Sequence, residues 1–397
     1  MQNFRIAILH EVSYLHKPVY EYQDFAERLA GLGHQVTVID FDEAQFGPLK
    51  TVQLSKTGLA KVKLITLPHY KALGLGILWA KYTFYWMFRR LLKEGRFDVV
   101  LVYSVFINGA NAVSLCRQFK IPVVYRVLDA YHRLRKSPIE SFLLKLGEQS
   151  IYRNANLIAV TNQKMDDYVH LLTNQRCAPV VFLDHGVDTM HFRPMERNAL
   201  LAGQLGISEN ACVGVFLGTT YGFSRLVNII ERMPYIRTQI PNFVLMIVGS
   251  GELDEKITQA IQRLADQSTV IQCGMIQYSQ LPNYLSLSQI ALNPFEINDI
   301  TREIIPIKML QYLASGLPVV CTPLPDVIKH FPHESSGVFY ADSDDLDEWI
   351  ETLIKLASTG SKGLHTDGTR AREYVSKHYS MNEAVHQLEQ ILHSVIT

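Results

Sequence analysis

The sequence predicts an α/β protein of two domains, each a parallel β-sheet with helices on both faces. Short apolar runs of strand length alternate with segments of helical periodicity along the chain, which is typical of βαβ units. The 397 residues are also too many for one ordinary core and suit two domains of about 190 residues each. Hydrophobic residues at 48% and charged residues at 19% indicate a globular, enzyme-like protein rather than a disordered or fibrous one.

The first half is predicted to hold seven strands, and a helix over Tyr20–Leu32 that ends at Gly33 joins the first two. The strands are expected at Arg5–Leu9, Gln35–Ile39, Val62–Thr66, Val99–Tyr103, Val123–Val127, Leu157–Val160 and Val180–Phe182.

The second half repeats the alternation, and a polar stretch over Arg193–Asn210 separates the two series. We therefore predict a first domain over residues 1–192, a second over 193–370, and a helical segment over 371–397 that returns to the first domain. Strands are expected at Val213–Leu217, Phe243–Val248, Val270–Gln272, Ile290–Leu292, Val319–Cys321 and Val338–Tyr340. Helices are expected at Arg225–Arg232, Leu253–Asp266, Leu281–Ser286, Pro306–Ser315 and Leu346–Ala357.

Gly74–Phe88 is rich in aromatic residues and is followed by Arg89, Arg90 and Lys93. It is too short to span a membrane. It is either an interfacial helix with aromatic anchors and basic neighbours or a buried helix of the first domain. Because its polar residues do not segregate to one face, the buried helix is favoured.

The charge is unevenly distributed. Residues 1–193 hold 24 Lys and Arg against 16 Asp and Glu, a net charge of +8, whereas the remainder holds 14 against 22, a net charge of −8. The first domain is therefore expected to meet an anionic surface or acceptor. Ordinary surface variation and attraction between the domains explain the asymmetry equally well.

No metal site is expected. Five cysteines lie far apart without CxxC spacing, which indicates reduced thiols. The run Asp342–Asp347 contains D-x-D but directly precedes a helix, so capping explains it. No signal-like segment precedes the first strand, and a cytoplasmic location is expected.

The segment from Asp299 to Val320 is the most informative. Pro306 suits the first turn of a helix and Gly316 its C-terminal end. Glu303 falls just before the helix, where free backbone N–H groups favour an anion, and Lys308 lies one turn inside. A diphosphate carrying a hexose fits this layout, because amides and Lys hold phosphate and a carboxylate accepts sugar hydroxyls.

This segment resembles the Glu-x7-Glu region of retaining glycosyltransferases of family four. Glu303 occupies the first Glu position, Pro306 and Lys308 match, and residues 312–320 match nearly throughout. The resemblance implies that Glu303 holds the donor sugar, and its neighbour Ile304 is a candidate donor-binding residue. The second Glu, which holds the ribose in the family, is Gln311 here.

Further matches follow in the family's order, and the similarity covers most of residues 155–345. Asp184–Asp188 and His191–Pro194 resemble the interdomain segment, and Val215–Thr220 and Ile247–Glu252 resemble the turns around the diphosphate. Cys273–Ile276 resembles the loop that contacts the base. These matches imply donor contacts from Gly218, Thr219, Gly249, Met275 and Ile276.

One departure concerns the basic pair that serves the diphosphate in the family. Thr219 and Ser224 stand at these positions, and Arg225 is adjacent. Arg225 is a candidate to supply the missing charge, and a solvated arginine at a helix start is the alternative.

In the first domain, the strand ending at Val127 leads into a loop with Asp129 and His132. Ligands bind at the carboxyl ends of parallel strands. Asp129 resembles the Asp of the family's strand-end segment, with a helix N-cap as its alternative. His132 is a second titratable candidate. Tyr14, His16 and Lys17 follow the first strand and are candidates for the acceptor side.

The resemblance implies the GT-B architecture, with two facing Rossmann-like domains and an active site in the interdomain cleft. It implies retention of anomeric configuration without metal or cofactor, and a UDP- or GDP-linked sugar as donor. Asp129, His132 and Glu303 are the candidate catalytic residues, His132 as a titratable group near Asp129. The acceptor is expected to be a glycan or a lipid-linked precursor, with peripheral contact to the anionic inner face of a membrane. No nucleic acid partner is expected.

Two other functions stay open. A nucleotide-sugar epimerase shares the architecture, and a non-catalytic sugar-binding homologue would explain Gln311 and the missing basic pair. A dehydrogenase is disfavoured, because no strand leads into G-x-G-x-x-G followed by an acidic residue.

Overall fold

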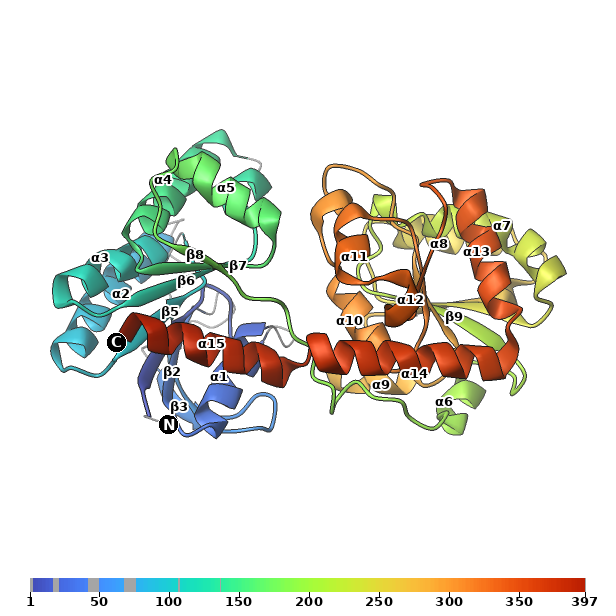
Figure 1. The fold of residues 1–397 in the computed structure, drawn as a ribbon, viewed down its shortest axis with the longest axis horizontal. Coiled ribbons are helices and arrows are strands. Elements are labelled where there is room, and N and C mark those ends of the chain that lie inside the picture. Colours follow the sequence, from blue (N-terminus) through green and yellow to red (C-terminus); the bar gives the residue numbers. More distant parts are fainter. Residues whose placement is uncertain are drawn as a thin grey trace. The chain divides into compact units, whose positions relative to one another are not determined.

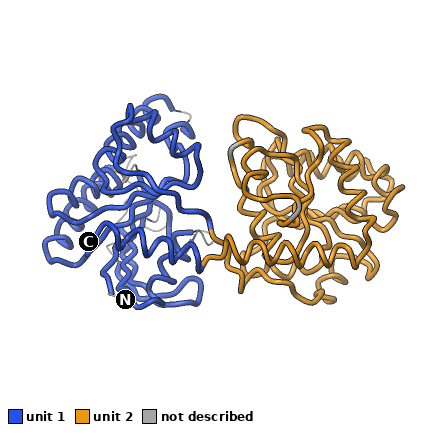
Figure 2. Tube along the Cα trace, viewed as in Figure 1, with its two compact units in different colours: residues 1–185, 382–397 blue, residues 186–381 orange. Residues whose placement is uncertain are grey.

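The structure is a computed structural model that describes residues 3–16, 21–41, 50–67, 76–105, 108–135 and 137–396, except for the side chains of Ile77, Glu303 and Glu334. The chain forms two compact units (Figure 2). Unit 1 comprises Met1–His185 and Asn382–Thr397, and unit 2 comprises Gly186–Met381.

Unit 1 contains an eight-stranded sheet in the order β3-β4-β2-β1-β5-β6-β7-β8 (Figure 1). All neighbours are parallel except β3 and β4. The strands are β1 (Arg5–Leu9), β2 (Gln35–Asp40), β3 (Lys50–Leu54), β4 (Val62–Thr66), β5 (Val99–Val102), β6 (Val123–Val127), β7 (Leu157–Val160) and β8 (Val180–Phe182).

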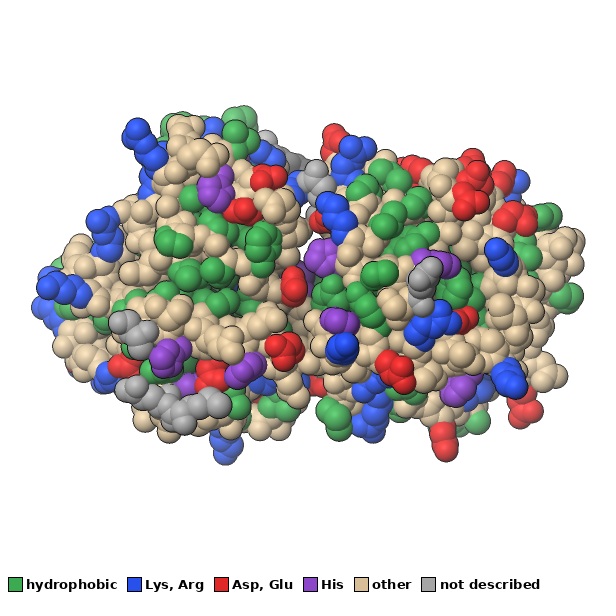
Figure 3. Space-filling model, in the orientation of Figure 1, with side chains coloured by type: hydrophobic (Ala, Val, Ile, Leu, Met, Phe, Trp, Pro, Cys, Tyr) green, Lys and Arg blue, Asp and Glu red, His purple; other side chains and the backbone are tan. Residues whose placement is uncertain are grey.

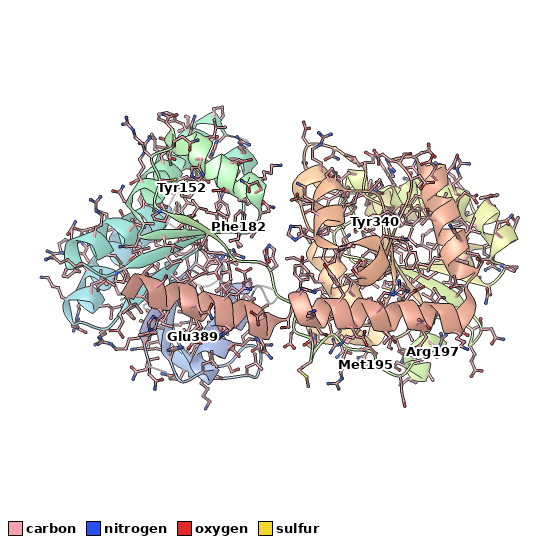
Figure 4. All side chains as sticks on the ribbon, in the orientation of Figure 1. Tyr152, Phe182, Met195, Arg197, Tyr340 and Glu389 are labelled. Atoms are coloured by element: carbon pink, nitrogen blue, oxygen red, sulfur yellow. The ribbon has the colours of Figure 1, made fainter. Side chains whose placement is uncertain are left out.

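Helices cover this sheet, and α2, α3, α4 and α5 pack side by side in chain order. The helices are α1 (Glu21–Gly31), α2 (Gly76–Lys93), α3 (Gly109–Phe119), α4 (Pro138–Asn154), α5 (Gln163–Thr173) and, from the far end of the chain, α15 (Met381–Ile396). Glu389 on α15, labelled in Figure 4, lies 3.1 Å from the His34 ring. This buried contact helps to attach α15 to unit 1.

Unit 2 contains a six-stranded, wholly parallel sheet in the order β11-β10-β9-β12-β13-β14. Its strands are β9 (Cys212–Leu217), β10 (Phe243–Val248), β11 (Val270–Gly274), β12 (Ile290–Asn293), β13 (Val319–Cys321) and β14 (Val338–Tyr340). Its helices are α6 (Ala199–Gln204), α7 (Leu226–Gln239), α8 (Asp254–Gln262), α9 (Leu281–Leu285), α10 (Ile307–Ala314), α11 (Pro325–His330), α12 (His333–Ser336), α13 (Leu346–Ala357) and α14 (Gly360–His378).

Each sheet has a point where the strand order reverses. In unit 1 it lies between β1 and β5, and in unit 2 between β9 and β12. Ligands of open α/β sheets bind beyond the carboxyl ends of the strands at such a point. The fold therefore directs attention to the residues that follow these four strands.

The unit boundary differs from the predicted one at residues 192 and 193. Residues 186–192 belong to unit 2 because the Val187 N–H donates to the Tyr379 carbonyl and Val187 O accepts from the Met381 N–H, each at 2.8 Å. The Arg372 guanidinium adds hydrogen bonds to the carbonyls of Thr189 and Phe192. Consequently only residues from 382 onward, rather than the whole of 371–397, join unit 1.

Three further differences each concern a single element. The antiparallel edge strand β3 was not predicted, and α6 lies inside the polar stretch expected to be a linker. Helix α7 continues seven residues past its predicted end at Arg232 and passes through Pro234. Its buried face, with Met233 and Ile236 at helical spacing, continues across the proline, so packing outweighs the lost backbone hydrogen bond.

Helix α2 matches neither of the two sequence interpretations completely. Ala80, Phe84 and Phe88 are fully buried, whereas Trp79 and Trp86 are exposed. The aromatic segment is thus a helix with one buried and one exposed apolar face. Among the described residues, no helix combines the length and hydrophobicity that crossing a bilayer would require.

Candidate active site

Lys308 lies at the reversal point of the unit 2 sheet. Its Nζ is 3.7 Å from the ring centroid of Phe216 on β9 and 4.1 Å from that of Phe295, which follows β12. The nitrogen is inaccessible to solvent and has no hydrogen-bond partner in the described part of the chain. Burial lowers the pKa of Lys308 well below its ordinary value. Burial thus disfavours the ammonium form of Lys308, and an arriving anion would supply the counter-charge that this form lacks.

Two glycine turns lie beside this cation. A side chain on Gly218 would begin 3.7 Å from Lys308 Nζ, and a Cβ on Gly249 would collide with the Gly218 carbonyl. Both residues have positive φ, +119° and +140°, a region that favours glycine. The Tyr312 hydroxyl, from α10, accepts a 2.6 Å hydrogen bond from the Leu217 N–H. Helix α10 thus fixes both the cation and the end of β9.

Arg225 does not stand free beside this site. Its Nη2 lies 2.7 Å from Asp344 and its Nε 3.7 Å from Glu296, so its charge is largely compensated. Thr219 is exposed at the turn, while Ser224 is buried and donates to the Tyr221 carbonyl. The structure therefore places Arg225 in an ion pair instead of in the position of the missing basic pair.

The loop after β11 lines a pocket of about 430 Å³. Met275 and Ile276 contribute from the loop, and the remaining walls come from α6, α9 and residues next to these two helices. Several of these walls carry amide side chains, namely Asn198, Gln204, Gln277, Gln280 and Asn283. The predicted base-contacting residues thus border a cavity of suitable polarity for a ring with donors and acceptors.

Of the Glu-x7-Glu segment, Glu303 ends the short turn Thr301–Glu303, and its side chain is outside the described part. Ile304 is partly buried and extended. Gln311 lies on α10 three residues after Lys308 and is partly buried. Residues three apart share a helix face, so Lys308 and Gln311 are brought together.

In unit 1, Asp129 and His132 both lie in the segment that follows β6, His132 in the turn Tyr131–Leu134. The Asp129 side chain is largely exposed, and its Oδ1 accepts from the Ala130 N–H at 3.0 Å, so it does not cap the following turn Tyr131–Leu134. Partial desolvation raises the pKa of Asp129 despite that hydrogen bond and the charge of Lys164. His132 donates or accepts at Nδ1 with Glu148, 2.7 Å away.

Sequence reasoning missed a charged cluster at this edge. Glu21 receives two hydrogen bonds of 2.9 Å from the buried Arg126 guanidinium, one of 2.8 Å from His185 and one of 3.3 Å from Tyr103. Burial alone would raise the pKa of Glu21, but Arg126 and His185 outweigh it and lower the pKa to about 2. Beside this cluster, burial lowers the pKa of His10 to about 4.

The signal for His10 and Arg126 was available in the sequence. His10 directly follows β1, and Arg126 interrupts an apolar strand. A charged residue inside a buried strand indicates a paired charge. Glu21 and His185 lie far from Arg126 in the sequence, and no pattern around them indicated that they pair with it.

The acceptor-side prediction needs a correction. Tyr14 is fully buried, and its hydroxyl donates to Glu27 at 2.9 Å. It therefore packs inside unit 1 and does not face an acceptor. His16 is exposed, and Lys17 lies outside the described residues.

No group of three or more metal-ligating side chains occurs among the described residues. The D-x-D run divides into other roles. Asp345 caps α13 by accepting from the Asp347 and Glu348 N–H groups, and Asp344 pairs with Arg225.

Family models match both halves of the chain. The model described as Glycosyltransferase Family 4 matches residues 22–191, and the model described as Glycosyl transferases group 1 matches residues 211–359, where the Lys308 site lies. The chain belongs to the family-four glycosyltransferases. This glycosyltransferase moves a sugar from a nucleotide-sugar donor to an acceptor.

Two curated proteins are similar to it. The α-monoglucosyldiacylglycerol synthase of Acholeplasma laidlawii is 19% identical over 346 residues, which cover 83% of this chain and 82% of that protein. The putative teichuronic acid biosynthesis glycosyltransferase TuaH of Bacillus subtilis is 29% identical over 91 residues, 23% of this chain and only 22% of that protein.

Solved structures confirm the predicted GT-B fold. Sucrose-phosphate synthase from Thermosynechococcus elongatus superposes with a TM-score of 0.74 at 15% identity and covers 98% of both chains. Anabaena HepE in complex with UDP superposes with a TM-score of 0.69 at 15% identity, covering 98% of this glycosyltransferase and all of that chain.

Proposed function

We propose that this glycosyltransferase is a retaining, metal-independent enzyme whose donor diphosphate binds at Lys308 and the glycine turns of unit 2. The buried, unpartnered Nζ of Lys308 carries the proposal. A buried ammonium without a counter-ion is costly, and a diphosphate at the Gly218 turn would neutralise it. Backbone amides and a cation at this point would also stabilise the leaving diphosphate.

The other residues take roles consistent with the family pattern. Glu303 holds the donor sugar, Met275 and Ile276 contact the base of a UDP- or GDP-linked hexose, and Gln311 lies near the ribose. A donor phosphate oxygen assists deprotonation of the acceptor on the face from which the leaving group departs. Asp129 and His132 belong to the acceptor side of this reaction.

A thermal-shift panel of UDP-, GDP- and ADP-linked sugars tests the donor site. A donor present at 100 times its Kd adds about 2.7 kcal/mol to the free energy of unfolding. The nucleotide sugars that carry the correct base should therefore raise the Tm clearly. Glu303→Ala should lower kcat/KM, by an amount that corresponds to about 2–4 kcal/mol of lost transition-state stabilisation, and should leave the Tm unchanged. Near-normal turnover of this variant would show that the donor sugar is held elsewhere.

Two observations favour a second candidate, a sugar-binding homologue without transfer activity. Gln311 replaces the family's second Glu, and Arg225 is engaged with Asp344. Slow hydrolysis of the donor in the absence of an acceptor would identify an enzyme. Donor binding without hydrolysis, across the whole panel of sugars, would support the binding protein.

The acceptor is proposed to be a glycan or lipid-linked glycan precursor at the anionic inner face of a membrane. Helix α2 presents an exposed face with Trp79, Tyr82 and Trp86, followed by Arg90 and Lys93. Aromatic anchors beside cations suit the interface of an anionic bilayer. Figure 3 shows Lys and Arg side chains along the rim of unit 1 where α2 and α3 lie in Figure 1.

Helix α4 adds a second apolar stripe beside the His132 loop. Ile139, Phe142, Leu143 and Leu146 follow helical spacing and are between 47% and 74% exposed. Contiguous exposed apolar side chains mark an interaction surface. The similarity to a synthase named for a glucosyl-diacylglycerol product supports a lipid partner.

Vesicle cosedimentation tests the membrane contact. Binding should be stronger to phosphatidylglycerol than to phosphatidylcholine vesicles and should weaken as salt rises. Trp86→Ser should weaken binding roughly tenfold, whereas Tyr235→Ser, at a similarly exposed aromatic of unit 2, should not. Equal binding to both vesicle types, or none to either, would contradict the membrane contact without touching the donor site.

A further inference from the structure

A buried carboxylate contacts the Nδ1 side of the His132 ring. Glu148, on α4, is fully buried. Its Oε2 lies 2.7 Å from His132 Nδ1 and 2.8 Å from the Tyr168 hydroxyl on α5, and its Oε1 accepts the Tyr131 N–H at 3.0 Å. One side chain thus connects two helices and the candidate catalytic loop.

These donors are what a buried carboxylate requires. Burial raises the pKa of Glu148, and the hydrogen bonds from Tyr168 and His132 act in the opposite direction. A buried carboxylate persists only where hydrogen bonds satisfy its oxygens. The other ionisable groups around the network are Tyr125 and Tyr152, which are buried, Tyr131, which is partly buried, and Asp129 and Arg133 on the loop.

The His132 ring is held in one orientation. It stacks on Tyr168 with centroids 5.8 Å apart and planes 23° apart. Its backbone carbonyl accepts from the Ser141 hydroxyl at 2.8 Å. The side chain is 13% exposed, and within the described ranges only Nδ1 of the two ring nitrogens has a hydrogen-bond partner.

We propose that Glu148 is a positioning residue that acts through His132. An ionised carboxylate accepts only, so it keeps the proton on Nδ1 and leaves the Nε2 lone pair directed outward. Nε2 then accepts a hydrogen bond from a substrate hydroxyl in a fixed direction. Tyr168 donates to the same carboxylate oxygen and prevents the ring from turning. The inference rests on the acceptor-side role proposed for His132.

A double-mutant cycle tests this coupling. Glu148→Gln removes the charge but keeps the side-chain shape, and kcat should fall on the order of tenfold or more with the donor KM unchanged. In a His132→Ala background, Glu148→Gln should lower kcat by less than about twofold, because the effects of two coupled residues are not additive. Glu140→Gln, at an exposed glutamate of the same helix, is the matched control and should leave kcat unchanged.

Additive losses in the cycle would overturn the inference, because Glu148 would then act independently of His132. Nitrogen-15 NMR of labelled histidine gives a readout separate from turnover. The His132 signal, assigned by its loss in His132→Ala, should show the proton on Nδ1, and Glu148→Gln should change the tautomer mixture. An unchanged tautomer would also overturn the inference.

The NMR result is independent of the proposed function. If His132→Ala turns over normally while the tautomer responds to Glu148→Gln, His132 is positioned as inferred but is not catalytic. If Glu148→Gln does not fold, Tyr168→Phe removes one hydroxyl from the network and should shift the tautomer mixture and kcat in the same direction, by less. No change in either for that variant would contradict the inference.

Discussion

Unit 1 and unit 2 each place a buried basic side chain at the carboxyl ends of parallel strands, and the two side chains differ in their partners. In unit 1, Arg126 is fully buried and bonded twice to Glu21. In unit 2, Lys308 has its Nζ between two aromatic rings and no hydrogen-bond partner among the described residues. Arg126 thus has its counter-charge within the protein, whereas Lys308 would obtain one from a bound anion.

This difference separates a structural charge from a binding charge. Removing one member of a buried ion pair leaves the other uncompensated. Removing a buried amino group that lacks a partner removes a cost of folding. The two cations should therefore respond in opposite ways to the same substitution.

The largest effect is expected for Arg126→Met. Glu21 would keep its buried charge without the guanidinium, which costs about 3–5 kcal/mol of stability. Urea unfolding followed separately for the two units should show the loss in unit 1 alone. A variant as stable as the wild type would mean that Arg126 is not needed to compensate Glu21.

Acidification tests the same cluster without mutation. The pKa of Glu21 is lowered from 4.5 to about 2, so its stabilisation is present above pH 4.5 and is lost as pH falls towards 2. The expected loss is about 3 kcal/mol. Glu21→Gln should be less stable at pH 7 and should lack this part of the acid dependence, which thermal unfolding between pH 2 and 6 would reveal.

Lys308→Met should show the opposite pattern. Donor binding should weaken by about 1.5–3 kcal/mol, the loss of a charge-assisted hydrogen bond. The Tm of the ligand-free protein should stay level or rise, because Met fills the space without a buried charge. Calorimetry of UDP binding and unfolding measures both quantities. A fall in Tm with unchanged affinity would place Lys308 among the structural cations.

The smallest effect is expected for Gln311→Glu, one turn after Lys308 on α10. A charged acceptor for the ribose hydroxyls is worth about 1 kcal/mol more than a neutral one. Donor affinity should then rise roughly fivefold. Unchanged affinity at unchanged Tm would show that the ribose is not at this position.

Much of the fold was predictable because parallel sheets bury their strands on both faces. Val99–Val102 and Phe243–Val248 are buried throughout, so they stand out as apolar runs. Strand β3 is an exposed edge and gives no such signal. The start of α14 was missed for another reason, since Gly360, Gly363 and Gly368 lower helix propensity while its packing against α10 and α13 sustains the helix.

The site residues of unit 2 could be predicted from the sequence more completely than those of unit 1. Lys308, Gln311 and Tyr312 lie on one segment, so their spacing indicated a shared helix. Glu148 and the Glu21–Arg126–His185 cluster assemble from distant segments, and only the tertiary fold brings them together. Tyr14 shows the converse error, because a loop position does not reveal which way a side chain points.

Unit 1 is discontinuous in sequence, and this has a consequence for biosynthesis. Helix α15 supplies the Glu389 partner of His34 and places His393 against the ring of Phe4, with centroids 5.7 Å apart. All of unit 2 is translated before α15 leaves the ribosome. Until α15 is made, the surface of unit 1 around Phe4 and His34 therefore lacks its contacts with that helix. A chaperone that recognises this surface would have its longest opportunity while unit 2 is being made.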